Sequence, residues 1–105
     1  MAENFEIAFS QEIYKHLRAI ERKYYGLIRE ALREHLSHTP NIETRNQKVL
    51  QKPAPFHATW ELRFGPHNRF RALYEVNEEE RVVLILAIGM KEGSRLFIGG
   101  EEIER

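Results

Sequence analysis

Two alternating stretches around a turn, residues 60–64 and 69–76, constrain the fold of this chain more than any other feature. Each stretch alternates apolar and polar side chains, as a β-strand with one buried face does. The apolar positions that fall on one shared face are Trp60, Leu62, Phe64, Phe70, Ala72, Tyr74 and Val76. A hairpin that buries this face pairs Phe64 with Phe70 and places Arg63 directly opposite Arg71 on the exposed face.

The two facing arginines indicate a binding surface for something anionic. Like charges directly opposite each other destabilise a sheet by about a few tenths of a kcal/mol or more. A chain that retains Arg63 and Arg71 in this register is expected to use both guanidinium groups on an anion. The composition agrees, because residues 44–74 carry six Lys and Arg residues against Glu61 alone, although the net charge of the chain is zero. An ordinary solvated surface is the alternative explanation of this uneven charge.

The first half of the chain is expected to form one strand followed by two helices. Residues 4–9 alternate, which predicts a short strand. Apolar side chains then recur at helical spacing over residues 13–32, and Ser10 is the expected N-cap. We expect a helical hairpin that breaks near residues 21–25 and ends near Ser37, with one long bent helix as the alternative.

The second half of the chain is expected to complete a small sheet. Residues 41–55 are expected to form a polar connection before the hairpin. Residues 82–91 are apolar on both faces, which favours a central strand with the first strand paired beside it. Residues 95–98 are expected to form a short strand or an extended tail. The expected fold class is α+β, in the order β-α-α-β-β-β plus a tail. Two helices cover one face of a mainly antiparallel sheet, and the face with Arg63 and Arg71 stays partly open.

Length and composition exclude several classes of protein. At 105 residues the chain is long enough for a core of its own, and we expect a single domain over residues 1–105. Cysteine is absent, which excludes disulfides and thiolate metal sites. The sequence shows no signal pattern, and no apolar run approaches the ~20 residues that span a bilayer. We therefore expect a cytoplasmic protein that binds no membrane, metal or cofactor.

The order of these elements, together with particular residues, resembles the RelE/ParE superfamily of toxins from type II toxin–antitoxin systems. The stretches that carry the resemblance are residues 44–50, 60–63, 69–76, 85–91 and 95–100. Each stretch is short, and their order along nearly the whole chain makes the match more specific than any one of them. The sequence is most similar to members called plasmid-stabilisation or addiction-module toxins.

The resemblance implies one of two quite different actions. RelE-like members cut mRNA in the ribosomal A site without a metal and so inhibit translation, whereas ParE-like members bind DNA gyrase and are not nucleases. Both kinds are neutralised by an antitoxin protein. The expected partners are therefore a cognate antitoxin and the ribosome with its mRNA, or alternatively DNA gyrase. A degenerate member that only binds its antitoxin is a third alternative.

The resemblance also assigns candidate site residues. Arg71 falls on the phosphate-contacting arginine of the family, and a guanidinium group holds two phosphate oxygens at once. Arg63 and Glu61 fall where RelE itself has lysines. Lys91 falls on a further arginine, and Phe97 falls on a late tyrosine. The implied catalytic residues are Arg63, Arg71, Lys91 and Glu61.

Further side chains are candidates for binding RNA or for moving protons. The additional cations are Arg45, Lys48, Lys52, Arg69 and Arg95. The expected use of those in the loop before the hairpin is long-range attraction of a phosphate backbone or an acidic antitoxin. Glu61 is a candidate base, and His57 or His67 is a candidate acid. His16, on the first expected helix, is expected to be exposed.

Overall fold

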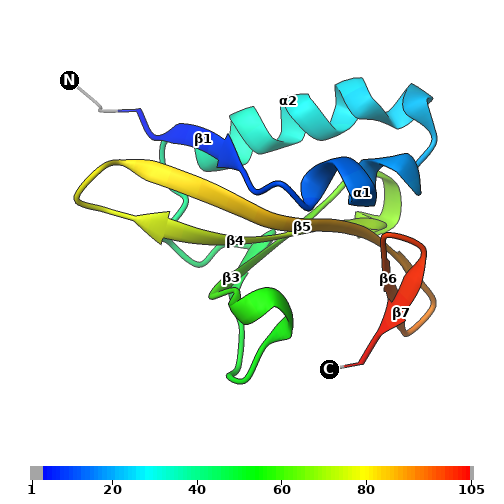
Figure 1. The fold of residues 1–105 in the computed structure, drawn as a ribbon. Coiled ribbons are helices and arrows are strands. Elements are labelled where there is room, and N and C mark those ends of the chain that lie inside the picture. The colour runs from blue at the N-terminus through cyan, green and yellow to red at the C-terminus, as the bar shows by residue number, and fades with distance from the viewer. Residues whose placement is uncertain (1–3, 105) are drawn as a thin grey trace.

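Residues 4–104, which the computed structural model describes, form a seven-stranded, mainly antiparallel sheet with helices on one face (Figure 1). Residues 1–3 and 105 of the expected domain lie outside the described residues. The helices are α1 (Ile13–Arg18) and α2 (Tyr25–Leu36). The strands are β1 (Glu6–Phe9), β2 (Gln47–Val49), β3 (Trp60–Phe64), β4 (Phe70–Asn77), β5 (Val82–Glu92), β6 (Arg95–Ile98) and β7 (Glu101–Ile103). The expected α+β fold class is confirmed.

Strand β5 is the centre of the sheet because three other strands pair with it. Strand β4 pairs antiparallel along one edge of β5. On the other edge β1 pairs in parallel, and β6 pairs antiparallel further along. The expected position of the first strand beside the apolar strand is therefore confirmed. Partners on both edges and side chains packed on both faces explain why β5 is apolar up to Met90.

The register of the β3–β4 hairpin is also the one expected. Phe64 is paired with Phe70, and Arg63 is paired with Arg71. The rings of Phe64 and Phe70 stack with their centroids 5.7 Å apart inside the larger of two cores, which lies between the sheet and the helices. The polar side of the hairpin consequently faces away from α1 and α2 (Figure 1).

The expected pair of helices needs correction, because only one helix is long. Helix α1 has 6 residues and α2 has 12. The chain leaves helical geometry at Glu21, where ψ is 138°, and returns through the 3₁₀ turn η1 (Arg22–Tyr24). Ser10 does not cap α1, whose N-cap position is Glu12. None of the described helices is long and apolar enough to cross a membrane.

The connection expected over residues 41–55 contains an edge strand, β2. Side chains hold this strand in place: the Thr44 hydroxyl accepts hydrogen bonds from the backbone N–H groups of Asn46 and Gln47 at 3.1 and 3.0 Å. The Asn46 amide donates to the carbonyl oxygen of Arg63 at 2.7 Å. A strand of three residues is too short to show alternation, so the sequence pattern did not reveal it.

A second, smaller core lies on the opposite face of the sheet, where β6 and β7 curl beneath it (Figure 1). Its buried members are Ala58, Leu73, Ala87, Leu96 and Ile98. Strand β6 approaches closely because Gly89 has no side chain, and a Cβ there would lie 2.6 Å from Cγ1 of Ile98. The face that was expected to be partly open is therefore covered at one end.

His16 is buried, with 4% of its surface exposed, so the expectation of an exposed residue was wrong. On β5 the pairing with β1 ends at Ile85 and the pairing with β6 begins at Gly89, which leaves a gap on this edge. The imidazole lies at the gap, where its Nδ1 accepts a hydrogen bond from the N–H of Ile88 at 3.3 Å. A side chain thus completes the hydrogen bonding of the central strand.

Lowering the pH is expected to destabilise the fold through His16. The ordinary pKa of histidine is 6.5, and burial lowers the pKa of His16 in the folded protein although Glu12 nearby raises it. The unfolded chain therefore binds the proton more readily, so the free energy of unfolding falls as the pH drops below 6.5 toward the folded pKa. Urea unfolding at about pH 7.5 and about pH 5.5 measures this difference.

The variant His16→Asn is the matched control for this prediction. Its amide oxygen accepts a hydrogen bond from the same N–H but does not titrate. It should lose less stability between the two pH values than the parent chain. An equal loss in both proteins would show that other groups carry the pH dependence and would contradict the assignment to His16.

Candidate anion-binding site

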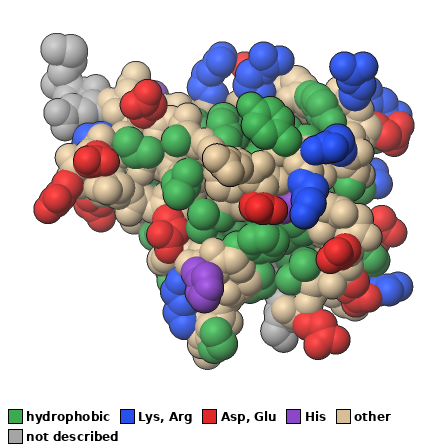
Figure 2. All heavy atoms as spheres, in the orientation of Figure 1, with side chains coloured by type: hydrophobic (Ala, Val, Ile, Leu, Met, Phe, Trp, Pro, Cys, Tyr) green, Lys and Arg blue, Asp and Glu red, His purple; other side chains and the backbone are tan. Residues whose placement is uncertain are grey.

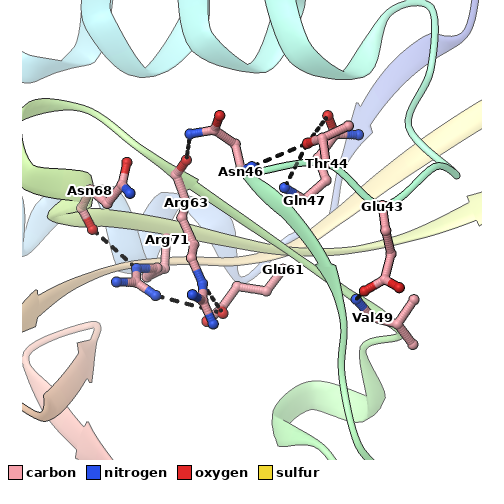
Figure 3. A network of polar contacts seen from close by, with 9 residues as sticks. All are labelled: Glu43, Thr44, Asn46, Gln47, Val49, Glu61, Arg63, Asn68 and Arg71. Atoms are coloured by element: carbon pink, nitrogen blue, oxygen red, sulfur yellow. Dashed lines mark hydrogen bonds and ion pairs between the residues drawn. The ribbon is translucent and has the colours of Figure 1, made fainter.

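Three charged side chains meet on the side of β3 and β4 that faces away from the helices (Figure 3). Paired residues of antiparallel strands point to the same side, so Arg63 and Arg71 share this side with Glu61. Nε of Arg63 donates to Oε1 of Glu61 at 3.1 Å, and Nη1 of Arg71 lies 3.6 Å from the same oxygen. The anion between the two facing arginines is therefore a carboxylate of the same chain. Its negative charge offsets the repulsion between the two guanidinium groups.

This Glu61 cluster (Glu61, Arg63 and Arg71) is largely withdrawn from solvent. The Glu61 side chain is 0% exposed, that of Arg71 is 8% exposed, and that of Arg63 is 38% exposed. Nε of Arg71 also donates to the carbonyl oxygen of Asn68 at 3.2 Å. Since a catalytic base must come within hydrogen-bonding reach of its substrate, the burial of Glu61 favours a role in orienting the arginines.

A cationic hollow of about 510 Å³ lies beside the Glu61 cluster, where the β3–β4 turn, the end of β5 and η1 meet. It is lined by the cations Arg69, Arg71 and Lys91, and also by His67 and Tyr24. A hydrogen bond of 2.7 Å from the N–H of Lys91 to the carbonyl oxygen of Arg69 holds two of these cations together. None of the described residues that line the hollow carries a carboxylate. The hollow is thus suited to an anion.

The turn between β3 and β4 shapes the cationic hollow through an unusual backbone. Gly65, His67 and Asn68 have φ values of 81°, 55° and 52°. Such left-handed conformations are unfavourable by about 1 kcal/mol or more for residues other than glycine. A Cβ at Gly65 would lie 2.6 Å from the Phe70 ring, so glycine is required there. The turn brings the Asn68 carbonyl to Arg71 and places His67 at the hollow.

Two of the predicted cations have partners elsewhere in the chain. The Lys52 ammonium group donates to the carbonyl oxygens of His57 and Ala58 at 3.1 and 2.8 Å, which closes its own loop. Arg95 pairs with Glu102 at 2.7 Å. Neither residue lines the cationic hollow.

The remaining charges lie in separate zones of the surface (Figure 2). Lys and Arg side chains gather over α2, and carboxylates gather at the tip of the β4–β5 hairpin, where residues 78–80 are all Glu. Lys48 is half-buried on β2 opposite Glu61, and Arg45 is exposed just before β2. Within residues 4–104, no group of three or more His, Cys, Asp or Glu side chains could hold a metal ion.

Tyr24 is one residue of the cationic hollow that the sequence did not identify as part of the site. Its helical spacing indicated a core residue, and its ring does pack against Phe70 with the centroids 5.1 Å apart. Part of the side chain nevertheless lines the hollow. No sequence pattern indicates this, because Tyr24 lies far along the chain from Arg69 and Lys91 and lines the same hollow only through tertiary packing.

Comparison with solved structures found chains of similar fold. The chain is similar to a chain of the toxin–antitoxin complex RelBE2 from Mycobacterium tuberculosis, with a TM-score of 0.65 and 20% sequence identity. The match covers 87% of this chain and 95% of that chain. This likeness shows a shared fold and confirms the fold that the RelE/ParE resemblance implied. No protein-family model matches the chain, and no curated protein is a significant match.

Replacing Glu61 with glutamine should destabilise the protein. The amide keeps the shape of the side chain but removes the negative charge between Arg63 and Arg71, so two guanidinium groups repel each other in a largely buried site. Breaking a buried ion pair by changing one partner is strongly destabilising. We expect Glu61→Gln to lower the free energy of unfolding, measured by urea unfolding, by about 3 kcal/mol.

The variant Glu75→Gln is the matched control for the Glu61 cluster. Glu75 is exposed on β4, where its carboxylate accepts a hydrogen bond of 3.4 Å from the Thr59 hydroxyl. Its replacement should change the free energy of unfolding by less than about 0.5 kcal/mol. If Glu61→Gln were as stable as this control, the carboxylate would not be what holds the two arginines together.

Proposed function

We propose that this protein is the toxin of a type II toxin–antitoxin system. In this proposal it is a metal-independent, ribosome-dependent endoribonuclease that cuts mRNA and inhibits translation in the cytoplasm. The observation that carries the proposal is the cationic hollow with Arg69, Arg71 and Lys91. Fixed cations stabilise the charge that grows on a phosphate during RNA cleavage. The fold shared with a chain of a toxin–antitoxin complex supports the toxin role.

The proposed reaction needs cations around a phosphate and groups that move protons. A base takes the proton of the ribose 2′-hydroxyl, whose oxygen attacks the adjacent phosphorus. The bond from phosphorus to the 5′-oxygen breaks, and this oxygen leaves with a proton from an acid, which gives a 2′,3′-cyclic phosphate. Arg71 and Lys91 hold the phosphate oxygens, and Arg63 supports Arg71 through Glu61. His67 is the proposed acid because it lines the same hollow.

The alternative function is non-enzymatic binding, either of DNA gyrase or of an antitoxin alone. Two observations favour it. Glu61 neutralises part of the charge of Arg63 and Arg71, which weakens their hold on a phosphate. Phe97 also has no proton to give at the position of the family's tyrosine. In every one of these functions the proposed protein partner is a cognate antitoxin.

Inducing the protein alone in bacteria tests the proposed nuclease. We expect early arrest of protein synthesis, cut mRNA and unchanged DNA supercoiling. These three outcomes are measured by amino-acid incorporation, by mapping of mRNA ends and by plasmid topology. The double variant Arg69→Gln with Lys91→Gln should reduce cutting at least ~tenfold, because it removes charge stabilisation from the phosphate. Neither residue belongs to the Glu61 cluster, so the double variant is expected to fold.

The matched control removes the same charge from another surface. Arg29 and Arg33 are exposed on α2, so Arg29→Gln with Arg33→Gln should leave the arrest of translation intact. Intact mRNA together with accumulating DNA breaks would contradict the nuclease and support gyrase inhibition. Normal growth at high expression of a folded protein would remove the toxin role.

A further inference from the structure

Tyr24 lines the cationic hollow, and the proposed reaction does not use it. Tyr24 is the last residue of η1, which follows the break after α1. Its ring packs against Phe70 at an interplanar angle of 57°, and this contact fixes its position. The side chain is half-buried and lines the hollow together with Arg69 and Lys91. An aromatic residue therefore lines the same hollow as three cations.

Two cations lie over the Tyr24 ring, but they are not held there firmly enough to block the access of a ligand. Nζ of Lys23 is 5.2 Å from the ring centroid, and Cζ of Arg69 is 6.0 Å from it. Lys23 also pairs with Glu21 at 3.8 Å, and both of these side chains are mostly exposed. Such surface pairs contribute little to stability, so the Lys23 side chain can leave the ring at little cost in free energy.

We propose that Tyr24 is a substrate-binding residue on which one base of a single-stranded RNA stacks, while the neighbouring phosphates contact Arg69 and Lys91. This inference rests on the proposed function and identifies how that site holds its substrate. Grooves that combine cations with aromatic rings bind single strands, because every base has a face that can stack. The bases of a duplex are already stacked on each other, so a duplex does not offer one to the ring.

The size and charge of the cationic hollow agree with this occupant. A volume of about 510 Å³ lies within the range of ~300–1,000 Å³ typical of small-molecule sites, so the hollow has room for one nucleotide. An acidic peptide would also be attracted by Arg69, Arg71 and Lys91, but its carboxylates do not stack on a ring. Dependence of binding on the Tyr24 ring therefore separates the two kinds of ligand.

Binding measured without ribosomes tests the role of Tyr24. The probe is a labelled single-stranded RNA of about eight nucleotides, and its binding is measured by fluorescence anisotropy. Inorganic polyphosphate, which has no bases, is the competitor. Tyr24→Leu should raise the Kd for RNA about tenfold, because it removes the ring on which the base stacks. It should leave the Kd for polyphosphate within about twofold. Arg69→Gln should weaken the binding of both ligands.

Salt dependence gives a second readout. The logarithm of the association constant falls linearly with the logarithm of the salt concentration. The magnitude of this slope should decrease by about 1 in Arg69→Gln and stay unchanged in Tyr24→Leu. Tyr14→Leu is the matched control, because Tyr14 is 74% exposed on α1, and it should bind like the parent. Tyr24→Phe retains the ring and should also bind like the parent. If Tyr24→Leu does not fold, Tyr24→Met retains apolar contact with Phe70 and takes its place.

Three results would overturn the inference. The first is parent-like affinity of Tyr24→Leu for RNA. The second is an equal loss of affinity for RNA and for polyphosphate in Tyr24→Leu. The third is binding of a polyglutamate peptide that is tighter than the binding of RNA and does not depend on Tyr24. Failure of the proposed function looks different. Intact mRNA in cells together with Tyr24-dependent RNA binding would remove only the nuclease, whereas parent-like cutting and RNA binding by Tyr24→Leu would remove only the role of Tyr24.

Discussion

The pairing of β5 with three other strands is the constraint on which the rest of the structure depends. Strand β4 occupies one edge, and β1 and β6 share the other. Because β1 leads directly into α1, its pairing draws both helices over the face that buries Phe64 and Phe70. Strand β6 turns under the opposite face and covers part of it. The cationic hollow forms where the end of β5, the β3–β4 turn and η1 meet.

The sequence predicted those parts of the fold in which a pattern repeats over several residues. Alternation in β3 and β4 was long enough to define the register that places Arg63 opposite Arg71, and the apolar run of β5 indicated a strand with neighbours on both sides. Strands β2 and β7 have three residues each, which is too few for a pattern. The position of β2 depends on hydrogen bonds from Thr44 and Asn46, and side-chain contacts of this kind leave no periodic signal.

The candidate site was predictable only in part. Arg71 and Lys91 line one hollow because they lie on the neighbouring strands β4 and β5; the family resemblance implied both residues, but the β4–β5 register, which shifts between Leu73 and Tyr74, was not predicted. The sequence shows the charge of Glu61 but not its burial, and burial between two guanidinium groups is what suits it to orient them. Lys52 is likewise a cation whose partners are loop carbonyls, which no pattern of residue types predicts. Tyr24 lines the hollow because of tertiary packing, which the sequence does not show.

The parallel pairing of β1 with β5 also determines when the fold can form. Glu6 is the partner of Val82, so the strand made first must wait for most of the chain before it can pair. Contacts between distant parts of a sequence close slowly, because the loop entropy is lost before the contact is gained. During synthesis the helices therefore have no complete sheet to cover until β5 has emerged. Arg71 and Lys91 come together at that same late stage, so an incomplete chain lacks the cationic surface.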